Sequence, residues 1–69
     1  PVILHVDDKE TNRYVIARIL DKAGFTVLQA ATGGDGLRLV TEELPDLVIL
    51  DVKLPDMSGI DVCRRIKSD

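Results

Sequence analysis

Three short apolar runs alternate with three segments of helical pattern, and this alternation constrains the fold more than any other feature of the chain. The apolar runs are Val2–Val6, Thr26–Ala30 and Leu47–Leu50. Short runs rich in β-branched residues are typical of strands, and continuously apolar ones are typical of strands buried on both faces of a parallel sheet. Parallel strands need a crossover connection, so we expect the intervening segments to be helices.

The segments between the runs carry helix signals of their own. Apolar side chains recur three and four residues apart, a spacing that places them on one helix face. The expected buried faces are Ile16, Ile19, Leu20 and Ala23, then Leu37, Val40 and Leu44, then Ile60, Cys63 and Ile66. Gly24 stands where a left-handed C-cap ends a helix, and Thr32 is a candidate N-cap for the next one. The predicted order is βαβαβα, an α/β fold.

The composition excludes several classes of protein. The 69 residues are enough for one small domain, and 45% hydrophobic residues are too many for a disordered segment. A single cysteine permits no internal disulfide, and a net charge of -3 argues against nucleic acid and against an anionic membrane surface as partners. No apolar run approaches the roughly 20 residues of a membrane helix, and no signal stretch opens the chain. The expected location is therefore cytoplasmic.

Two of the apolar runs end in acidic residues. Asp7 and Asp8 follow the first run, and Asp51 follows the third. In open α/β sheets, ligands bind beyond the carboxyl ends of the strands, at the switch in strand order. If the first and third strands are neighbours, the three carboxylates converge there and repel one another. A divalent cation relieves that repulsion. A ligand set of carboxylates that includes no His or Cys fits Mg²⁺ better than zinc.

The residues around this acidic edge form a pattern that is specific enough to compare with a family. The two segments that carry it are Val2–Asp8, which is VILHVDD, and Leu47–Gly59, which is LVILDVKLPDMSG. An Asp-Asp pair after one strand, together with an apolar strand followed by Asp-x-x-x-Pro-x-x-x-Gly, resembles the receiver domains of two-component response regulators. The resemblance covers the whole chain, residues 1–69. It implies a phosphorylation-controlled regulatory domain in signal transduction, and not an enzyme.

The resemblance assigns roles to the acidic residues. Asp51 is implied to be the phosphoacceptor, which receives its phosphoryl group from a phosphohistidine on a histidine kinase or a histidine phosphotransfer domain. The implied cofactor is Mg²⁺, with Asp8 and Asp51 as direct ligands and Asp7 acting through water. Lys53 is implied to contribute its backbone carbonyl to the same ion. The residues implied to shape the loop after the acceptor are Pro55 and Gly59.

The resemblance also implies a fold, of which these residues supply a part. The family has a flavodoxin-like sheet of five parallel strands, and residues 1–69 match its first three strands and helices, in strand order 2-1-3. The family's signalling Thr or Ser and its phosphate-pairing Lys follow the fourth and fifth strands, so neither is matched here. We therefore expect a partial receiver domain that is impaired in Mg²⁺ binding and phosphorylation. We also expect self-association through the open edge of the third strand, residues 47–50.

Other interpretations of the chain stay open at this point. One alternative is a phosphorylation-independent interaction or dimerisation module. Another is an aspartate-nucleophile phosphatase, but that enzyme needs a general-acid Asp two residues after the nucleophile, where this chain has Lys53. His5 lies within a strand and is expected to be structural.

The segment after the acidic pair bears on partners and on the parent protein. Asn12 and Arg13 are equally compatible with a surface helix turn and with a contact to a kinase. The run Thr11–Arg13, taken with the loop at residues 53–59, resembles receivers that are attached to sensor kinases. The parent protein could therefore be a hybrid histidine kinase.

Overall fold

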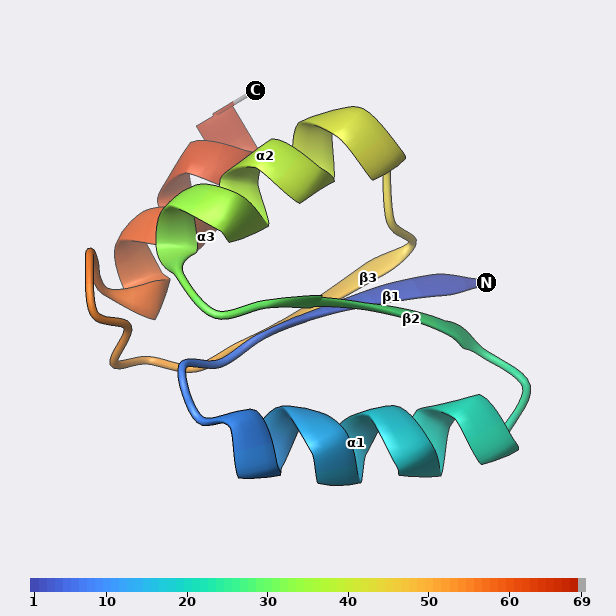
Figure 1. The fold of residues 1–69 in the computed structure, drawn as a ribbon. Coiled ribbons are helices and arrows are strands. Elements are labelled where there is room, and N and C mark those ends of the chain that lie inside the picture. Colours follow the sequence, from blue (N-terminus) through green and yellow to red (C-terminus); the bar gives the residue numbers. More distant parts are fainter. Residues whose placement is uncertain (69) are drawn as a thin grey trace.

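The fold alternates strands and helices along the chain, as the sequence predicts (Figure 1). The structure is a computed structural model that describes residues 1–68. Its elements are β1 (Val2–Val6), α1 (Glu10–Lys22), β2 (Thr26–Ala30), α2 (Gly33–Glu43), β3 (Leu47–Leu50) and α3 (Gly59–Ser68). The predicted bounds of all three strands are confirmed, and α1 ends one residue earlier than predicted.

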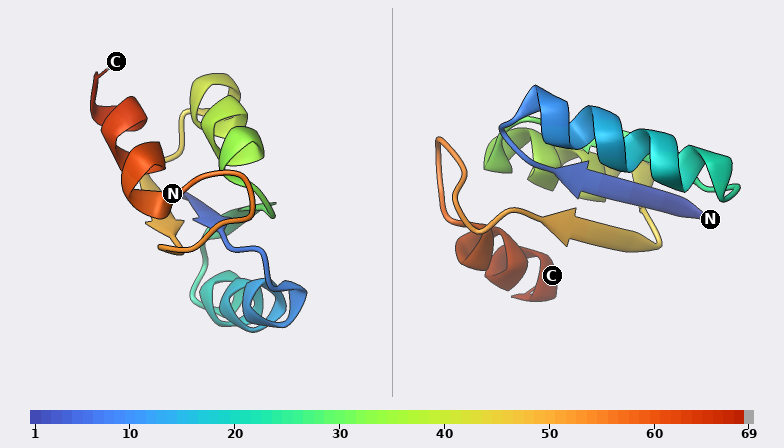
Figure 2. Two further views of the ribbon diagram at one scale, coloured as in Figure 1. Left: turned by 90° about the vertical axis from the view of Figure 1, so that its left-hand side faces the viewer. Right: turned by 90° about the horizontal axis from the view of Figure 1, so that it is seen from below.

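The three strands form one parallel sheet with β1 between β2 and β3. Helix α1 covers one face of this sheet, and α2 and α3 cover the other (Figures 1 and 2). In the register of the sheet, Val6 lies opposite Ala30 of β2 and Leu50 of β3. The carboxyl ends of the strands therefore meet at one edge, and the predicted α/β order 2-1-3 is confirmed.

The core lies between the sheet and the helices α2 and α3. Leu4 and Val6 are both 0% exposed and form its centre. Since side chains alternate between the two faces of a strand, His5 and Asp7 point to the opposite side, toward α1. Helix α2 approaches β1 closely because residue 36 is glycine: a β-carbon there would lie 2.9 Å from Val6 Cγ2.

The helix ends follow the predicted caps. Thr32 Oγ1 accepts a hydrogen bond from the Asp35 amide at 3.1 Å, which satisfies one of the free amides in the first turn of α2. Beyond α1, Gly24 takes a left-handed φ of 94° and donates its amide hydrogen to the Asp21 carbonyl at 3.0 Å. Both predicted caps are confirmed.

The buried faces of the helices differ from the predicted ones. Ile19 is 59% exposed, because α1 lies alone on its face among the described elements. Leu44 is 77% exposed, because it ends α2 at a left-handed φ of 47° that takes it off the helix stripe. In α3, Val62 is 0% exposed, whereas Ile60 is 56% exposed. The stripe that faces the core passes through Val62 and Ile66, four residues apart, so Ile60 falls beside it.

Candidate functional site

Three carboxylates meet at the carboxyl edge of the sheet. Asp7 and Asp8 follow β1, Asp51 follows β3, and one oxygen of each lies within 4.8 Å of the others. The sheet fixes two of these residues through their backbones: the Asp51 amide donates to the Val6 carbonyl at 2.9 Å, and the Asp7 amide donates to the Ala30 carbonyl at 3.0 Å. The structure thus brings together the three acids that the sequence predicts at this edge.

The three acids differ in their surroundings. Asp7 is buried at 7% exposure, Asp51 is half-buried, and Asp8 is exposed. Burial raises the pKa of the Asp7 carboxyl, but hydrogen bonds from the Lys9 amide and the Asn12 side chain, together with electrostatic interactions with His5 and Lys9, outweigh it. The pKa of Asp7 is therefore lowered from its ordinary value, which favours the ionised form that binds cations.

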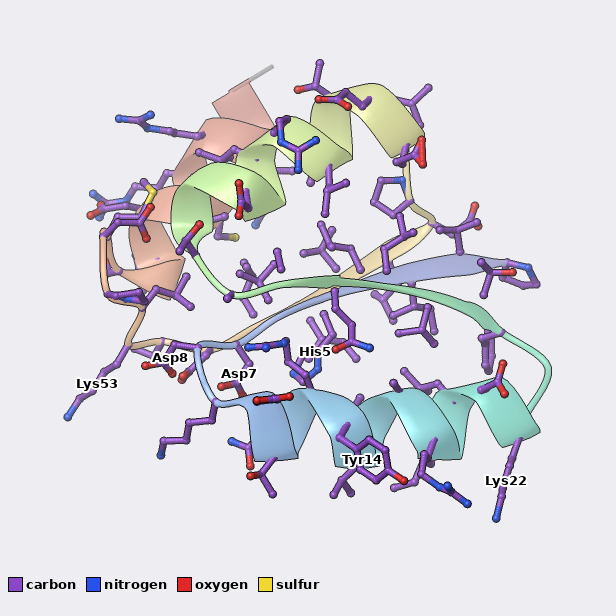
Figure 3. The ribbon with its side chains drawn as sticks, in the orientation of Figure 1. His5, Asp7, Asp8, Tyr14, Lys22 and Lys53 are labelled. Atoms are coloured by element: carbon purple, nitrogen blue, oxygen red, sulfur yellow. The ribbon has the colours of Figure 1, made fainter. Side chains whose placement is uncertain are left out.

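His5 lies beside Asp7, between the sheet and α1, as Figure 3 shows. Its side chain is buried, and its Nε2 lies 3.8 Å from Asp7 Oδ2, which is longer than a hydrogen bond. Its Nδ1 is buried without a hydrogen-bond partner among the described residues. Beside it is a hollow of about 340 Å³ lined by His5, Asp7, Asn12, Val15 and Ile16. The burial of His5 agrees with the structural role expected from the sequence.

The loop after β3 is closed by short-range hydrogen bonds. The Lys53 amide donates to Asp51 Oδ1 at 3.3 Å, and Lys53 and Ser58 form an isolated antiparallel bridge. The Gly59 amide donates to the Val52 carbonyl at 2.8 Å. The Lys53 side chain is exposed and points away from the acidic edge (Figure 3). The loop therefore turns back on itself directly behind Asp51.

A glycine is required where this loop enters α3. A β-carbon on Gly59 would overlap the Asp51 carbonyl oxygen, and it would lie 2.9 Å from the Asp51 carbonyl carbon and 3.0 Å from Val52 Cα. All three are backbone atoms, so no rotation of a side chain could relieve the contact. The close approach explains physically why position 59 carries glycine.

Asp56 connects the same loop to α2, and the sequence analysis did not find this contact. Asp56 Oδ1 accepts the Gly33 amide at 2.8 Å, and Asp56 Oδ2 accepts the Gly34 amide at 2.9 Å. These hydrogen bonds, the one from Gly34 first, lower the pKa of Asp56 from its ordinary value. A Gly-Gly pair at a helix N-terminus leaves its amides open to an anion, and this signal could have suggested the contact.

Comparison with known proteins identifies the family. The family model described as "Response regulator receiver domain" matches residues 3–69, so the chain belongs to the receiver domains of two-component response regulators. Sporulation initiation phosphotransferase F of Bacillus subtilis is 45% identical over 65 residues, which are 94% of this chain and 52% of that protein. Transcriptional regulatory protein AfsQ1 of Streptomyces coelicolor is 43% identical over 67 residues, 97% of this chain and 30% of that protein.

Solved structures agree on the fold. A response regulator receiver domain protein from Clostridium thermocellum has a TM-score of 0.92 at 40% identity, covering 97% of this chain and 55% of that chain. Response regulator TrrA from Thermotoga maritima, solved in complex with Mg²⁺ and BeF, has a TM-score of 0.94 at 33% identity, covering 97% of this chain and 58% of that chain. The flavodoxin-like receiver fold predicted from the sequence is confirmed, and the chain spans about half the length of these two structures.

Membership in the family sets the general role of the domain. Receiver domains are regulatory phosphoacceptor domains that interact with histidine kinases or phosphotransfer proteins, and they bind Mg²⁺ at an acidic pocket. Within the described residues, no helix has the length and apolar character needed to cross a membrane.

Proposed function

We propose that Asp51 is the phosphoacceptor of this receiver domain and takes its phosphoryl group from a phosphohistidine of a histidine kinase or phosphotransfer domain. The observation that carries the proposal is the meeting of Asp7, Asp8 and Asp51 within 4.8 Å at the carboxyl edge of the sheet. A carboxylate oxygen of Asp51 attacks phosphorus, the phosphorus–nitrogen bond of the phosphohistidine breaks, and an acyl phosphate forms. Asp51 Oδ1 accepts the Lys53 amide hydrogen, which leaves Oδ2 as the oxygen free to attack.

The chemistry of the donor set fits Mg²⁺. Three carboxylates and nearby backbone oxygens are hard ligands, and Mg²⁺ typically takes one or two carboxylates and keeps several waters. We assign Asp8 and Asp51 as direct ligands, with the backbone carbonyl of Lys53. We assign Asp7, which is buried and accepts hydrogen bonds from the Lys9 amide and from Asn12, a role through water. When bound, the ion offsets the negative charge on the phosphoryl oxygens.

The remaining residues of the site shape the loop that presents Asp51. Gly59 allows the backbone to close behind Asp51, and Pro55 fixes φ in the middle of the loop. We propose that residues 1–69 form the first three strands and helices of the receiver domain. Two residues of the family have no counterpart among these residues: the Lys that neutralises phosphate charge, and the Thr or Ser that couples phosphorylation to movement of the output face.

Two points are tested by phosphorylating the 69-residue chain with a small-molecule phosphodonor and measuring its intact mass: that Asp51 is the acceptor, and that phosphorylation of this chain is impaired. We expect slow and incomplete phosphorylation of the wild-type chain in the presence of Mg²⁺ and none of Asp51→Asn. Equal phosphorylation of both chains would show that Asp51 is not the acceptor. Prompt stoichiometric phosphorylation of the wild type alone would show that the acceptor is right and that the proposed impairment is wrong.

We also propose that a second copy of this chain pairs with the open edge of β3. β3 is bonded to β1 on one side, and Leu47 at its start is 55% exposed. Next to it lies an apolar groove of about 390 Å³, whose lining includes Val40, Leu44, Val48, Leu50, Cys63 and Ile66. A two-fold axis through this edge pairs the two β3 strands antiparallel and presents the same residues from each copy.

The oligomeric state tests the self-association proposal. Sedimentation equilibrium is expected to show dimers of the wild-type chain whose population rises with concentration. Leu47→Lys places a charge on the edge and is expected to shift the equilibrium toward monomer. A folded wild-type monomer at high concentration contradicts the proposal.

A further inference from the structure

Side chains in the first turn of α1 bind both the carboxylate and the backbone carbonyl of Asp7. Asn12 Nδ2 donates to Asp7 Oδ2 at 3.2 Å, and Arg13 Nη1 donates to the Asp7 backbone oxygen at 2.7 Å. The Lys9 amide donates to Asp7 Oδ1 at 2.9 Å. Each carboxylate oxygen of Asp7 thus has a donor of its own, which fixes the plane of the carboxylate as well as its position.

Asn12 is suited to this task by charge and by location. Its amide is neutral, so it orients the carboxylate without placing a positive charge where a cation would bind. His5 Nε2 lies 3.8 Å from Asp7 Oδ2, beyond hydrogen-bond distance. Asn12 itself is exposed on the surface of α1, so the core does not depend on it.

We propose that Asn12 is a positioning residue of the metal site, which orients Asp7 toward the acidic cluster and so raises the affinity for a divalent cation. The proposal rests on the metal site assigned above. A carboxylate that is already oriented loses less freedom when an ion and its waters bind. Removing the hydrogen-bond partner of a direct ligand typically weakens metal binding by about 10- to 100-fold, and because Asp7 acts through water we expect an effect at the lower end of that range for Asn12. Arg13 also fixes the position of Asp7, because its side chain donates a hydrogen bond to the Asp7 backbone carbonyl from the same turn of α1.

The test is the dissociation constant for Mg²⁺ alone, measured by isothermal titration calorimetry without any phosphodonor. Asn12→Ala is expected to weaken binding about 10-fold. Asn12→Gln keeps an amide donor and is expected to bind more tightly than Asn12→Ala. Thr11→Ala changes the neighbouring exposed position of the same turn and serves as the matched control, with an unchanged constant. Far-UV circular dichroism without metal checks the fold of each variant, and alanine, as the better helix former, should preserve α1.

The outcomes distinguish the positioning role of Asn12 from the metal site on which that role rests. Asp8→Asn is expected to abolish Mg²⁺ binding if the cluster is the metal site. If that loss is seen but Asn12→Ala binds like the wild type, the metal site stands and the positioning role is refuted. If Asn12→Ala loses helical signal in parallel with affinity, and Asn12→Gln does the same, Asn12 is structural and the proposal is refuted. If the wild type binds no more Mg²⁺ than Asp8→Asn, the metal site itself is refuted and the positioning role with it.

Discussion

Replacing Gly59 with alanine tests how the loop behind Asp51 is closed. The added β-carbon would overlap the Asp51 carbonyl oxygen and lie 2.9 Å from the Asp51 carbonyl carbon. Carbon atoms at their optimal separation are about 3.5–4.0 Å apart, so the backbone must move by at least roughly 0.5 Å. Such a movement also breaks or stretches the hydrogen bond from the Gly59 amide to the Val52 carbonyl, now 2.8 Å.

The expected loss of stability follows from these two contacts. Forcing extra volume into a packed site costs about 1–3 kcal/mol, and the lost hydrogen bond costs about 0.5–1.5 kcal/mol. Together they cost about 1.5–4.5 kcal/mol, a large share of the roughly 3–10 kcal/mol expected for a domain of 69 residues. Urea unfolding followed by far-UV circular dichroism measures the difference between the variant and the wild type.

A second glycine provides the control for this measurement. A β-carbon on Gly34 would meet only the Asp56 carboxylate, at 3.3 Å, and this side chain can move. Gly34→Ala should therefore change the free energy of unfolding by less than about 1 kcal/mol, since better helix propensity offsets the close contact. If Gly59→Ala unfolds at the same urea concentration as the wild type, the backbone contact does not constrain the loop and the reasoning is wrong.

Two further predictions concern stability. Leu4→Ala removes a fully buried side chain and should lower the free energy of unfolding by about 2–5 kcal/mol, whereas Ile60→Ala, at 56% exposure, should change it by less than about 1 kcal/mol in the same urea experiment. Because the pKa of Asp56 is lowered in the folded state, the ionised Asp56 carboxylate stabilises the fold at pH values above the ordinary carboxyl pKa. This stabilisation is lost as the pH falls through the folded-state pKa of Asp56. Asp56→Asn should therefore flatten the acid side of a plot of urea midpoint against pH, and an unchanged slope would contradict this.

The strands and the acidic cluster were predictable because their signals are local and strong. The bounds of all three strands follow from short apolar runs that end at Asp or are bounded by turn residues. The meeting of Asp7, Asp8 and Asp51 then follows from one topological rule, that the carboxyl ends of neighbouring parallel strands share an edge. The family match and the solved relatives confirm the fold class on which that rule depends.

The helix faces and the contacts between loops were harder to predict because they depend on neighbours. Ile60, Cys63 and Ile66 recur at every third residue, as in a helix, but the packing of α3 against α2 buries Val62 and leaves Ile60 exposed. Leu44 looks like the end of an apolar stripe, yet it takes a left-handed conformation where α2 stops. The bond from Asp56 to the start of α2 joins positions more than 20 residues apart in sequence. No pattern within a single segment specifies such a pair.

The same topology that gathers the acids also supplies part of what offsets their repulsion. In a parallel sheet with helical crossovers, every helix begins near the edge at which the strands end, so positive helix ends surround the carboxylates. Here the amide of Lys9, which precedes α1, binds Asp7, and the first amides of α2 bind Asp56 in the acceptor loop. The amide of Lys53 in turn binds Asp51. Backbone amides thus hold Asp7, Asp51 and Asp56 in place, and in the proposed metal site the cation would offset the remaining charge.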